Sequence, residues 1–238
     1  PAAGVLIDDI YGYEGLEELT GSGVWISRAF EVAKSRPVEF VGGPNPAATL
    51  RTWPEEHVVK VNLYMHPGDD EEIKELQEQK ILQLYDACIK NERRLLLEVQ
   101  PTQGTSYDEN SMVELLERFY EVGVRADWWK LPPNRDPEVW KRIGDVVREH
   151  DPYCAGVLIL GQALEEEALG ELFAAAASEP LCNGFAIGRS IYGGHARRWL
   201  AGEIGDEELI SSVAEGYGRM NALWEKRTES RTREDATG

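Results

Sequence analysis

Basic residues are scarce in this chain of 238 residues. Its 25 Lys and Arg stand against 43 Asp and Glu, which gives a formal net charge of −18 and an isoelectric point near 4.7. Such a balance repels nucleic acid backbones and anionic membrane surfaces, so we expect neither as a partner. A phosphorylated ligand would need a locally built site of arginine, backbone N–H groups and helix N-termini.

Cysteine and histidine are also rare. The three cysteines, Cys88, Cys154 and Cys182, have no CxxC spacing, and the four histidines fall into no metal-ligand pattern. These absences argue against a disulfide framework and against a zinc site. We expect reduced, buried cysteines, no bound metal and no cofactor.

Several sequence signatures are missing as well. No apolar run approaches the length of a membrane span, and no signal peptide is visible, so the expected location is the cytoplasm. The chain has no P-loop, no Ser-His-Asp order and no GxGxxG fingerprint in the context of a dinucleotide fold. These nucleotide-binding and hydrolase classes are therefore disfavoured.

The chain does contain short apolar, β-branched runs that recur about every 30 residues, the length of a βα unit. Amphipathic helical segments separate most of them. The expected strands are Gly4–Ile7, Pro37–Val41, Val58–Tyr64, Arg94–Val99, Ala126–Leu131, Ala155–Leu160 and Gly184–Ile187. The expected helices are Glu71–Lys90, Ser111–Val122, Pro137–Arg148 and Glu165–Ala177.

Alternating strands and helices predict a parallel sheet, and near-continuous apolar strands indicate that both of its faces are covered. We therefore predict an α/β fold of the (β/α)8 TIM barrel class, spanning residues 1–227. Its first strand is apparently missing: an eighth strand lies upstream, or Gly23–Ile26 fills the gap, or the barrel is open. The charged residues 228–238 are expected to form a disordered or non-native tail.

Three consecutive expected strands each carry an ionisable residue within apolar sequence, namely Lys60, Glu98 and Lys130. In a barrel, inward side chains near the C-terminal ends of strands form the active site. An amine beside a second ammonium in a partly apolar cavity loses its proton more easily, which suits Lys130 to Schiff-base chemistry. Glu98 would then move protons.

Two structural interpretations compete with this catalytic one. An isolated lysine usually lays its stem over apolar surface and keeps its ammonium in water. A Lys-Glu ion pair can also brace neighbouring strands without any chemistry. The convergence of three charges from neighbouring strands favours a site.

Further candidates line the expected strand ends. Glycines there let backbone N–H groups approach an anion, and the loops after the last two barrel strands often hold phosphate, with an arginine as a bidentate clamp. The candidate substrate- and phosphate-binding residues are Gly161, Gly188, Arg189, Asp8, Asn62 and His66. For His66 and Asp8, an ordinary loop role is the alternative.

With these residues assembled, the chain resembles the 2-deoxy-5-keto-gluconate-6-phosphate aldolase-like family associated with myo-inositol breakdown, and more distantly the tagatose-bisphosphate aldolases. The segments that carry the likeness are Gly4–Asp8, Trp53–Lys60, His66–Pro67, Leu95–Glu98, Asp127–Leu131, Gly184–Arg189 and Trp199–Ile204. One departure is Pro132, where tagatose-type relatives carry an acid.

The resemblance implies a metal-independent class I aldolase barrel that acts on a small phosphorylated keto sugar or keto sugar acid. Lys130 matches its Schiff-base lysine, Glu98 its acid/base carboxylate and Lys60 its auxiliary lysine. Gly188 and Arg189 match its phosphate-binding segment. Two alternatives stay open: a non-catalytic sugar-phosphate-binding or regulatory barrel, and imine chemistry of the transaldolase or isomerase type. Association of identical chains is also left open.

Overall fold

The computed structural model describes residues 4–162 and 164–227. Parallel strands alternate with helices along these residues, which confirms the predicted α/β barrel class. The chain divides into two compact units. The first contains the residues up to Leu131 together with Asp145–Gly156, and the second contains Pro132–Gly144 and the residues from Val157 onward. The tail predicted for residues 228–238 lies outside the described residues.

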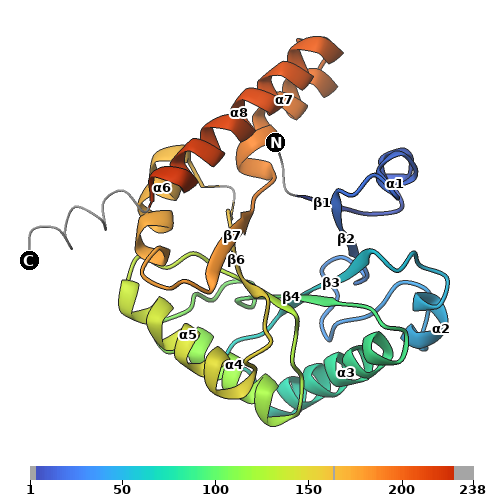
Figure 1. The fold of residues 1–238 in the computed structure, drawn as a ribbon, viewed down its shortest axis with the longest axis vertical. Coiled ribbons are helices and arrows are strands. Elements are labelled where there is room, and N and C mark those ends of the chain that lie inside the picture. The colour runs from blue at the N-terminus through green and yellow to red at the C-terminus, as the bar shows by residue number, and fades with distance from the viewer. Residues whose placement is uncertain (1–3, 163, 228–238) are drawn as a thin grey trace, which may run out of the picture. The chain divides into compact units, whose positions relative to one another are not determined.

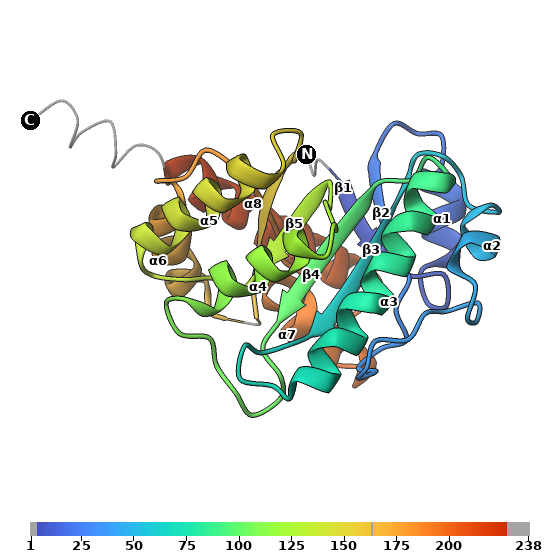
Figure 2. The same cartoon turned by 90° about the horizontal axis from the view of Figure 1, so that it is seen from below.

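The first unit holds five parallel strands that pair in chain order. They are β1 (Gly4–Ile7), β2 (Trp25–Ala29), β3 (His57–Tyr64), β4 (Leu95–Gln100) and β5 (Trp128–Leu131). Figure 2 shows β2, β3 and β4 side by side. The register sets Ala29 beside Lys60, Asn62 beside Glu98, and Glu98 beside Lys130. Three neighbouring strands thus bring their polar residues to one level of the sheet.

Helices cover the outer face of these strands, as Figure 1 shows for α3 (Glu71–Lys90) below β3 and β4. The predicted bounds of α3 are confirmed, and its acidic first turn and Lys90 in its last turn complement the helix dipole. The other helices of this unit are α1 (Tyr13–Leu19), α2 (Pro46–Leu50) and α4 (Ser111–Glu121). Ile81 and Leu84 of α3 are buried, as is Cys88, whereas Leu76 of the same helix is 39% exposed.

The predicted strand at Pro37–Val41 is wrong. This segment folds back antiparallel to the residues after β2, with a single bridge between Glu31 and Phe40. The backbone N–H of Val38 donates to Oε1 of Gln77 on α3 at 2.6 Å, so it joins no strand ladder. The place in the sheet belongs to β2, which overlaps the alternative segment Gly23–Ile26.

The second unit contains β6 (Gly156–Leu160, of which Gly156 is assigned to the first unit) and β7 (Cys182–Ala186), which pair in parallel. Its helices are α6 (Glu166–Ala176), α7 (Arg189–Leu200) and α8 (Asp206–Lys226), and α5 (Pro137–His150) contributes its first half. The rings of Phe173, Phe185 and Trp224 pack together at centroid distances of 5.1–5.6 Å. This aromatic cluster joins β7 to α6 and α8.

Within the described ranges, no helix combines the length and the apolar character that crossing a membrane requires.

Candidate active site

Lys60, Glu98 and Lys130 converge on the inward face of β3, β4 and β5. Because side chains alternate along a strand and the three strands pair in register, the three charges lie on one side of the sheet. The Nζ atom of Lys130 lies 2.9 Å from Oε2 of Glu98, and the Nζ atom of Lys60 lies 3.2 Å from the same oxygen. One carboxylate oxygen is therefore shared by two lysine side chains.

Burial and the neighbouring charges shift the pKa values of the two lysines in opposite directions. Burial lowers the pKa of Lys130, and although Glu98 opposes this effect, the nearby Lys60 ammonium adds to it, so that the pKa lies below its ordinary value. Burial also disfavours the charged form of Lys60, but Glu98 and a second carboxylate outweigh it and raise its pKa. The arrangement therefore makes Lys130 the more easily deprotonated amine of the two and Lys60 the more firmly protonated one.

Glu98 is held ionised between the lysines. Its burial favours the protonated form, but the charges of Lys60 and Lys130 outweigh this effect and lower the pKa of the carboxyl group. Its other oxygen, Oε1, accepts a hydrogen bond of 2.6 Å from Nε2 of Gln100. The same amide nitrogen lies 3.3 Å from Oδ1 of Asn62, whose own amide donates to the Tyr64 hydroxyl. These contacts place the predicted residue Asn62 beside the charged cluster and fix the Glu98 carboxylate.

Glu31 is the site residue that the sequence analysis missed. Its Oε1 lies 2.6 Å from Nζ of Lys60, and its side chain is only 10% exposed. Glu31 follows β2 on the same side as Ala29, the register partner of Lys60. The run Trp25–Phe30 ahead of an acid was the available signal, but the expected strand there ended at Ile26.

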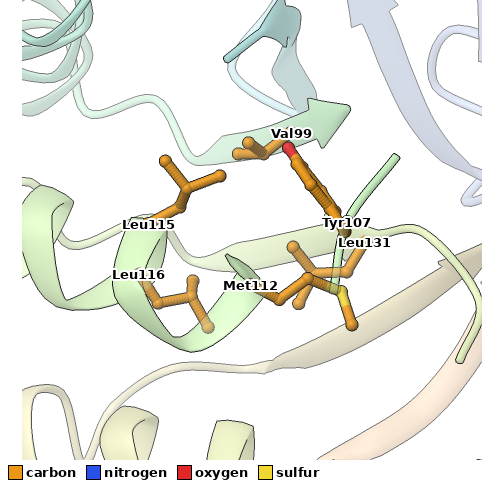
Figure 3. A pocket seen from close by; sticks show the side chains of 6 residues that line it. All are labelled: Val99, Tyr107, Met112, Leu115, Leu116 and Leu131. Atoms are coloured by element: carbon orange, nitrogen blue, oxygen red, sulfur yellow. The ribbon is translucent and has the colours of Figure 1, made fainter. Parts of the chain in front are cut away.

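The opposite face of the same strands is apolar. A small pocket there is lined by Val99, Tyr107, Met112, Leu115, Leu116 and Leu131, with the side chains of α4 on one side (Figure 3). Val99 and Leu131 directly follow Glu98 and Lys130, so they point the other way. The hydroxyl of Tyr107 donates to the carbonyl of Met65 at 2.8 Å. Nothing ionised lines this pocket, and it belongs to the packing of α4.

Asp8 and His66 serve their own loops. Oδ1 of Asp8 accepts hydrogen bonds from the backbone N–H groups of Ile10 and Tyr11, both at 2.8 Å. The ring of His66 accepts from the N–H of Gly68 at Nδ1, and its Nε2 lies 3.2 Å from the carbonyl oxygen of Ser106. Neither residue contacts the charged cluster through these bonds.

The predicted anion-binding residues Gly161, Gly188 and Arg189 lie in the second unit. A Cβ atom at Gly161 would come within 2.9 Å of two side-chain carbons of Ile187, so the tight approach requires glycine. Gly188 precedes the first turn of α7, which begins at Arg189, and no side chain caps this helix. Arg189 is exposed. A free helix N-terminus next to a guanidinium is the kind of site that holds a phosphate group.

Among the residues that the structure describes, no group of three or more His, Cys, Asp or Glu side chains is arranged to hold a metal ion.

Comparison with known proteins gives a family and a fold. The family model described as "Uncharacterized protein conserved in bacteria (DUF2090)" matches residues 1–228. Over 78 residues the chain is 35% identical to the UPF0473 protein of Staphylococcus aureus strain JH9, which covers 33% of this chain and 72% of that protein.

Solved structures of aldolases share the fold. Fructose-bisphosphate aldolase from Plasmodium falciparum aligns with a TM-score of 0.63 at 12% identity, over 95% of this chain and 77% of that one. A Schiff-base-forming fructose-1,6-bisphosphate aldolase aligns with a TM-score of 0.54 at 18% identity, over 79% and 71%. At these identities the likeness establishes the fold alone.

Proposed function

The chain belongs to the DUF2090 family, and we propose that it is a class I aldolase that uses Lys130 to form a Schiff base with a phosphorylated keto sugar or keto sugar acid. The observation that carries this proposal is the buried Lys130 amine, whose pKa is lowered, at 2.9 Å from a carboxylate. A neutral amine next to an ionised acid is what carbinolamine chemistry requires. The aldolase barrels of similar fold support the same reaction class.

In the proposed reaction, the lone pair of the neutral Lys130 nitrogen attacks the ketone carbon, and uptake of one proton with loss of one water gives an iminium ion. A base then removes the proton of the hydroxyl group two carbons away from the iminium carbon. The bond between the hydroxyl-bearing carbon and the carbon next to the iminium carbon breaks, an aldehyde leaves, and the bonding electrons move into an enamine. Protonation of the enamine and addition of water release the second product, a dihydroxyacetone phosphate-like ketone, and regenerate the amine.

The other residues of the cluster have roles that follow from their charges. Glu98 contacts Lys130 directly, which suits it to carry protons for dehydration and for bond cleavage. The raised pKa of Lys60 suits its ammonium to stabilise negative charge on a substrate oxygen, and its charge disfavours the protonated form of Lys130. Gly161, Gly188 and Arg189 are the proposed phosphate ligands. A substrate such as 2-deoxy-5-keto-gluconate 6-phosphate has the required ketone, hydroxyl and phosphate groups.

Trapping with borohydride tests the proposal. Treatment with dihydroxyacetone phosphate and sodium borohydride should add the mass of a reduced ketone adduct to the protein, and peptide mass spectrometry should locate it on Lys130. Lys130→Met should abolish the adduct. The control Lys141→Met removes a half-exposed lysine of α5 and should leave trapping unchanged. An unlabelled Lys130 in the wild-type protein would end the proposal, and sugar-phosphate binding without turnover would favour a binding barrel.

A further inference from the structure

Glu31 forms the fourth member of a row of alternating charges. The row runs from Oε1 of Glu31 to Nζ of Lys60 at 2.6 Å, from there to Oε2 of Glu98 at 3.2 Å, and on to Nζ of Lys130 at 2.9 Å. All four side chains are at most 10% exposed. Because Lys60 is closer to Glu31 than to Glu98, its ammonium is pulled away from the oxygen that Lys130 also needs.

The backbone holds Glu31 firmly in this place. The N–H of Phe30 donates to the carbonyl of Lys60 at 2.9 Å, which extends the pairing of β2 and β3 by one residue. On its other side, Glu31 forms the antiparallel bridge to Phe40, and the N–H of Val32 donates to the carbonyl of Glu39 at 2.7 Å. Two flanking segments thus fix the point from which the carboxylate reaches Lys60.

The second oxygen of Glu31 is unusual. Oε2 is buried, and no hydrogen-bond donor within the described residues contacts it. A buried ion pair that only braces two strands stabilises the fold when both carboxylate oxygens are satisfied. Here, Lys60 is the single ion-pair partner of Glu31 within the described ranges. The Glu31 carboxylate therefore acts through its ion pair with Lys60, and its second oxygen forms no hydrogen bond with the surrounding described residues.

We propose that Glu31 is a positioning residue that holds the Lys60 ammonium between two carboxylates and so keeps the Glu98 oxygen available to Lys130. Its action on Lys130 passes mainly through Lys60. Removing the Glu31 charge would let Lys60 move fully onto Glu98, where it competes with Lys130 for the shared oxygen. This inference rests on the proposed function for its importance in catalysis, but its electrostatic content is independent of any substrate.

The charged groups that act on Lys130 come from three elements: Glu98 from β4, Lys60 from β3 and Glu31 from the segment after β2. Loss of the Glu31 charge removes one influence that favours the Lys130 ammonium and strengthens the competition from Lys60. Both effects have the same sign, so Glu31→Gln should shift the titration of Lys130 to lower pH.

Nuclear magnetic resonance of protein labelled with ¹⁵N at the lysine Nζ atoms measures this shift without substrate. The signals are assigned with Lys60→Met and Lys130→Met. In Glu31→Gln, the midpoint of Lys130 should fall by about one pH unit, a common size for perturbed groups in proteins, so that its neutral fraction at a given pH rises about tenfold. Glu31→Asp, which keeps the charge on a shorter side chain, should shift the midpoint in the same direction but by less.

Two comparisons separate positioning from a merely structural role. Glu78→Gln neutralises an equally buried carboxylate that pairs with Arg118 at 2.7 Å, outside the cluster, and should leave the Lys130 midpoint unchanged. In a Lys60→Met background, Glu31→Gln should shift Lys130 by less than it does when Lys60 is present. If Glu31→Gln fails to fold, Glu31→Asp decides, because it should lower the Lys130 midpoint whereas Glu78→Gln should leave it unchanged.

An unchanged Lys130 midpoint in both Glu31 variants would overturn the inference, as would an equal shift with and without Lys60. Borohydride trapping in the wild-type protein distinguishes this failure from failure of the proposed function. A trapped wild-type Lys130 with an unmoved midpoint in the variants removes only the role of Glu31. Absence of wild-type trapping removes the aldolase proposal and leaves the titration result standing.

Discussion

The two faces of β4 and β5 are both buried, but their side chains are chemically opposite. Glu98 and Lys130 are 5% and 8% exposed on the inward face, while their neighbours Val99 and Leu131 are 2% and 1% exposed on the face toward α4. The inward face carries a row of charges, and the other face carries an apolar pocket (Figure 3). Burial alone therefore does not distinguish a functional site from the hydrophobic core. Burying charged side chains costs free energy, so a buried cluster of charges points to a site.

This contrast predicts that substitutions on the two faces have separable effects. Changes on the inward face should alter chemistry more than the free energy of unfolding. Changes on the outward face should alter the free energy of unfolding and leave the chemistry of each folded molecule intact.

The largest effect is expected for Glu98→Gln, which keeps the shape of the side chain and removes its proton-carrying function. The rate of substrate cleavage should fall by about 10²–10⁴-fold, the usual contribution of general acid–base catalysis. Steady-state kinetics with a phosphorylated keto sugar acid measures this. Glu78→Gln is the matched control, because Glu78 is as buried as Glu98 and also ion-paired. Equal losses in the two variants would contradict a special role for Glu98.

On the apolar face, Leu116→Ala should lower the free energy of unfolding by about 2–5 kcal/mol, because it enlarges a pocket that is already present beneath α4. Denaturation by urea measures the change. Met112→Leu, which roughly conserves volume in the same pocket, should cost less than about 1.5 kcal/mol. Borohydride trapping per folded molecule should stay at the wild-type level in both variants. Loss of trapping would contradict the prediction that substitutions on the two faces have separable effects.

A smaller effect is expected in acid. The folded pKa of Glu98 lies below that of the unfolded chain, so the stability it contributes is present above the unfolded value, about 4.3, and is lost as pH falls through the folded pKa. We expect protonation of this carboxylate to account for part of the acid-induced loss of stability. Urea denaturation as a function of pH should show a shallower acid decline for Glu98→Gln than for the wild-type protein. Parallel curves would contradict this assignment.

The sequence was sufficient to predict those site residues whose position depends on the alternation of side chains along a strand. Lys60, Glu98 and Lys130 interrupt apolar runs that are unmistakably strands, so period two and parallel pairing place them together. Asn62 follows from the same reasoning. Glu31 could not be placed, because it lies beyond the end of β2, and its contact with Lys60 depends on a backbone bridge to Phe40.

The strand predicted at Pro37–Val41 is wrong for a physical reason, whereas the site roles predicted for Asp8 and His66 stay predictions. Pro37–Val41 has the composition of a strand, but the pairing partner decides whether an apolar segment joins a sheet, and its backbone pairs with residues 30–32 and with Gln77 instead. Asp8 and His66 follow strands, as site residues often do. Short polar side chains at such positions also bond readily to their own loop, and both of these do so.

The central claim is that the charged cluster shifts the pKa values of the two lysines apart, so that Lys130 serves as the amine and Lys60 as the cation. The most direct test is a pH titration of the Nζ signals of wild-type protein labelled with ¹⁵N-lysine. Lys130 should lose its proton at a lower pH than Lys60. If Lys60 loses its proton before Lys130, or if the two lysines titrate together, the assignment of these roles is contradicted.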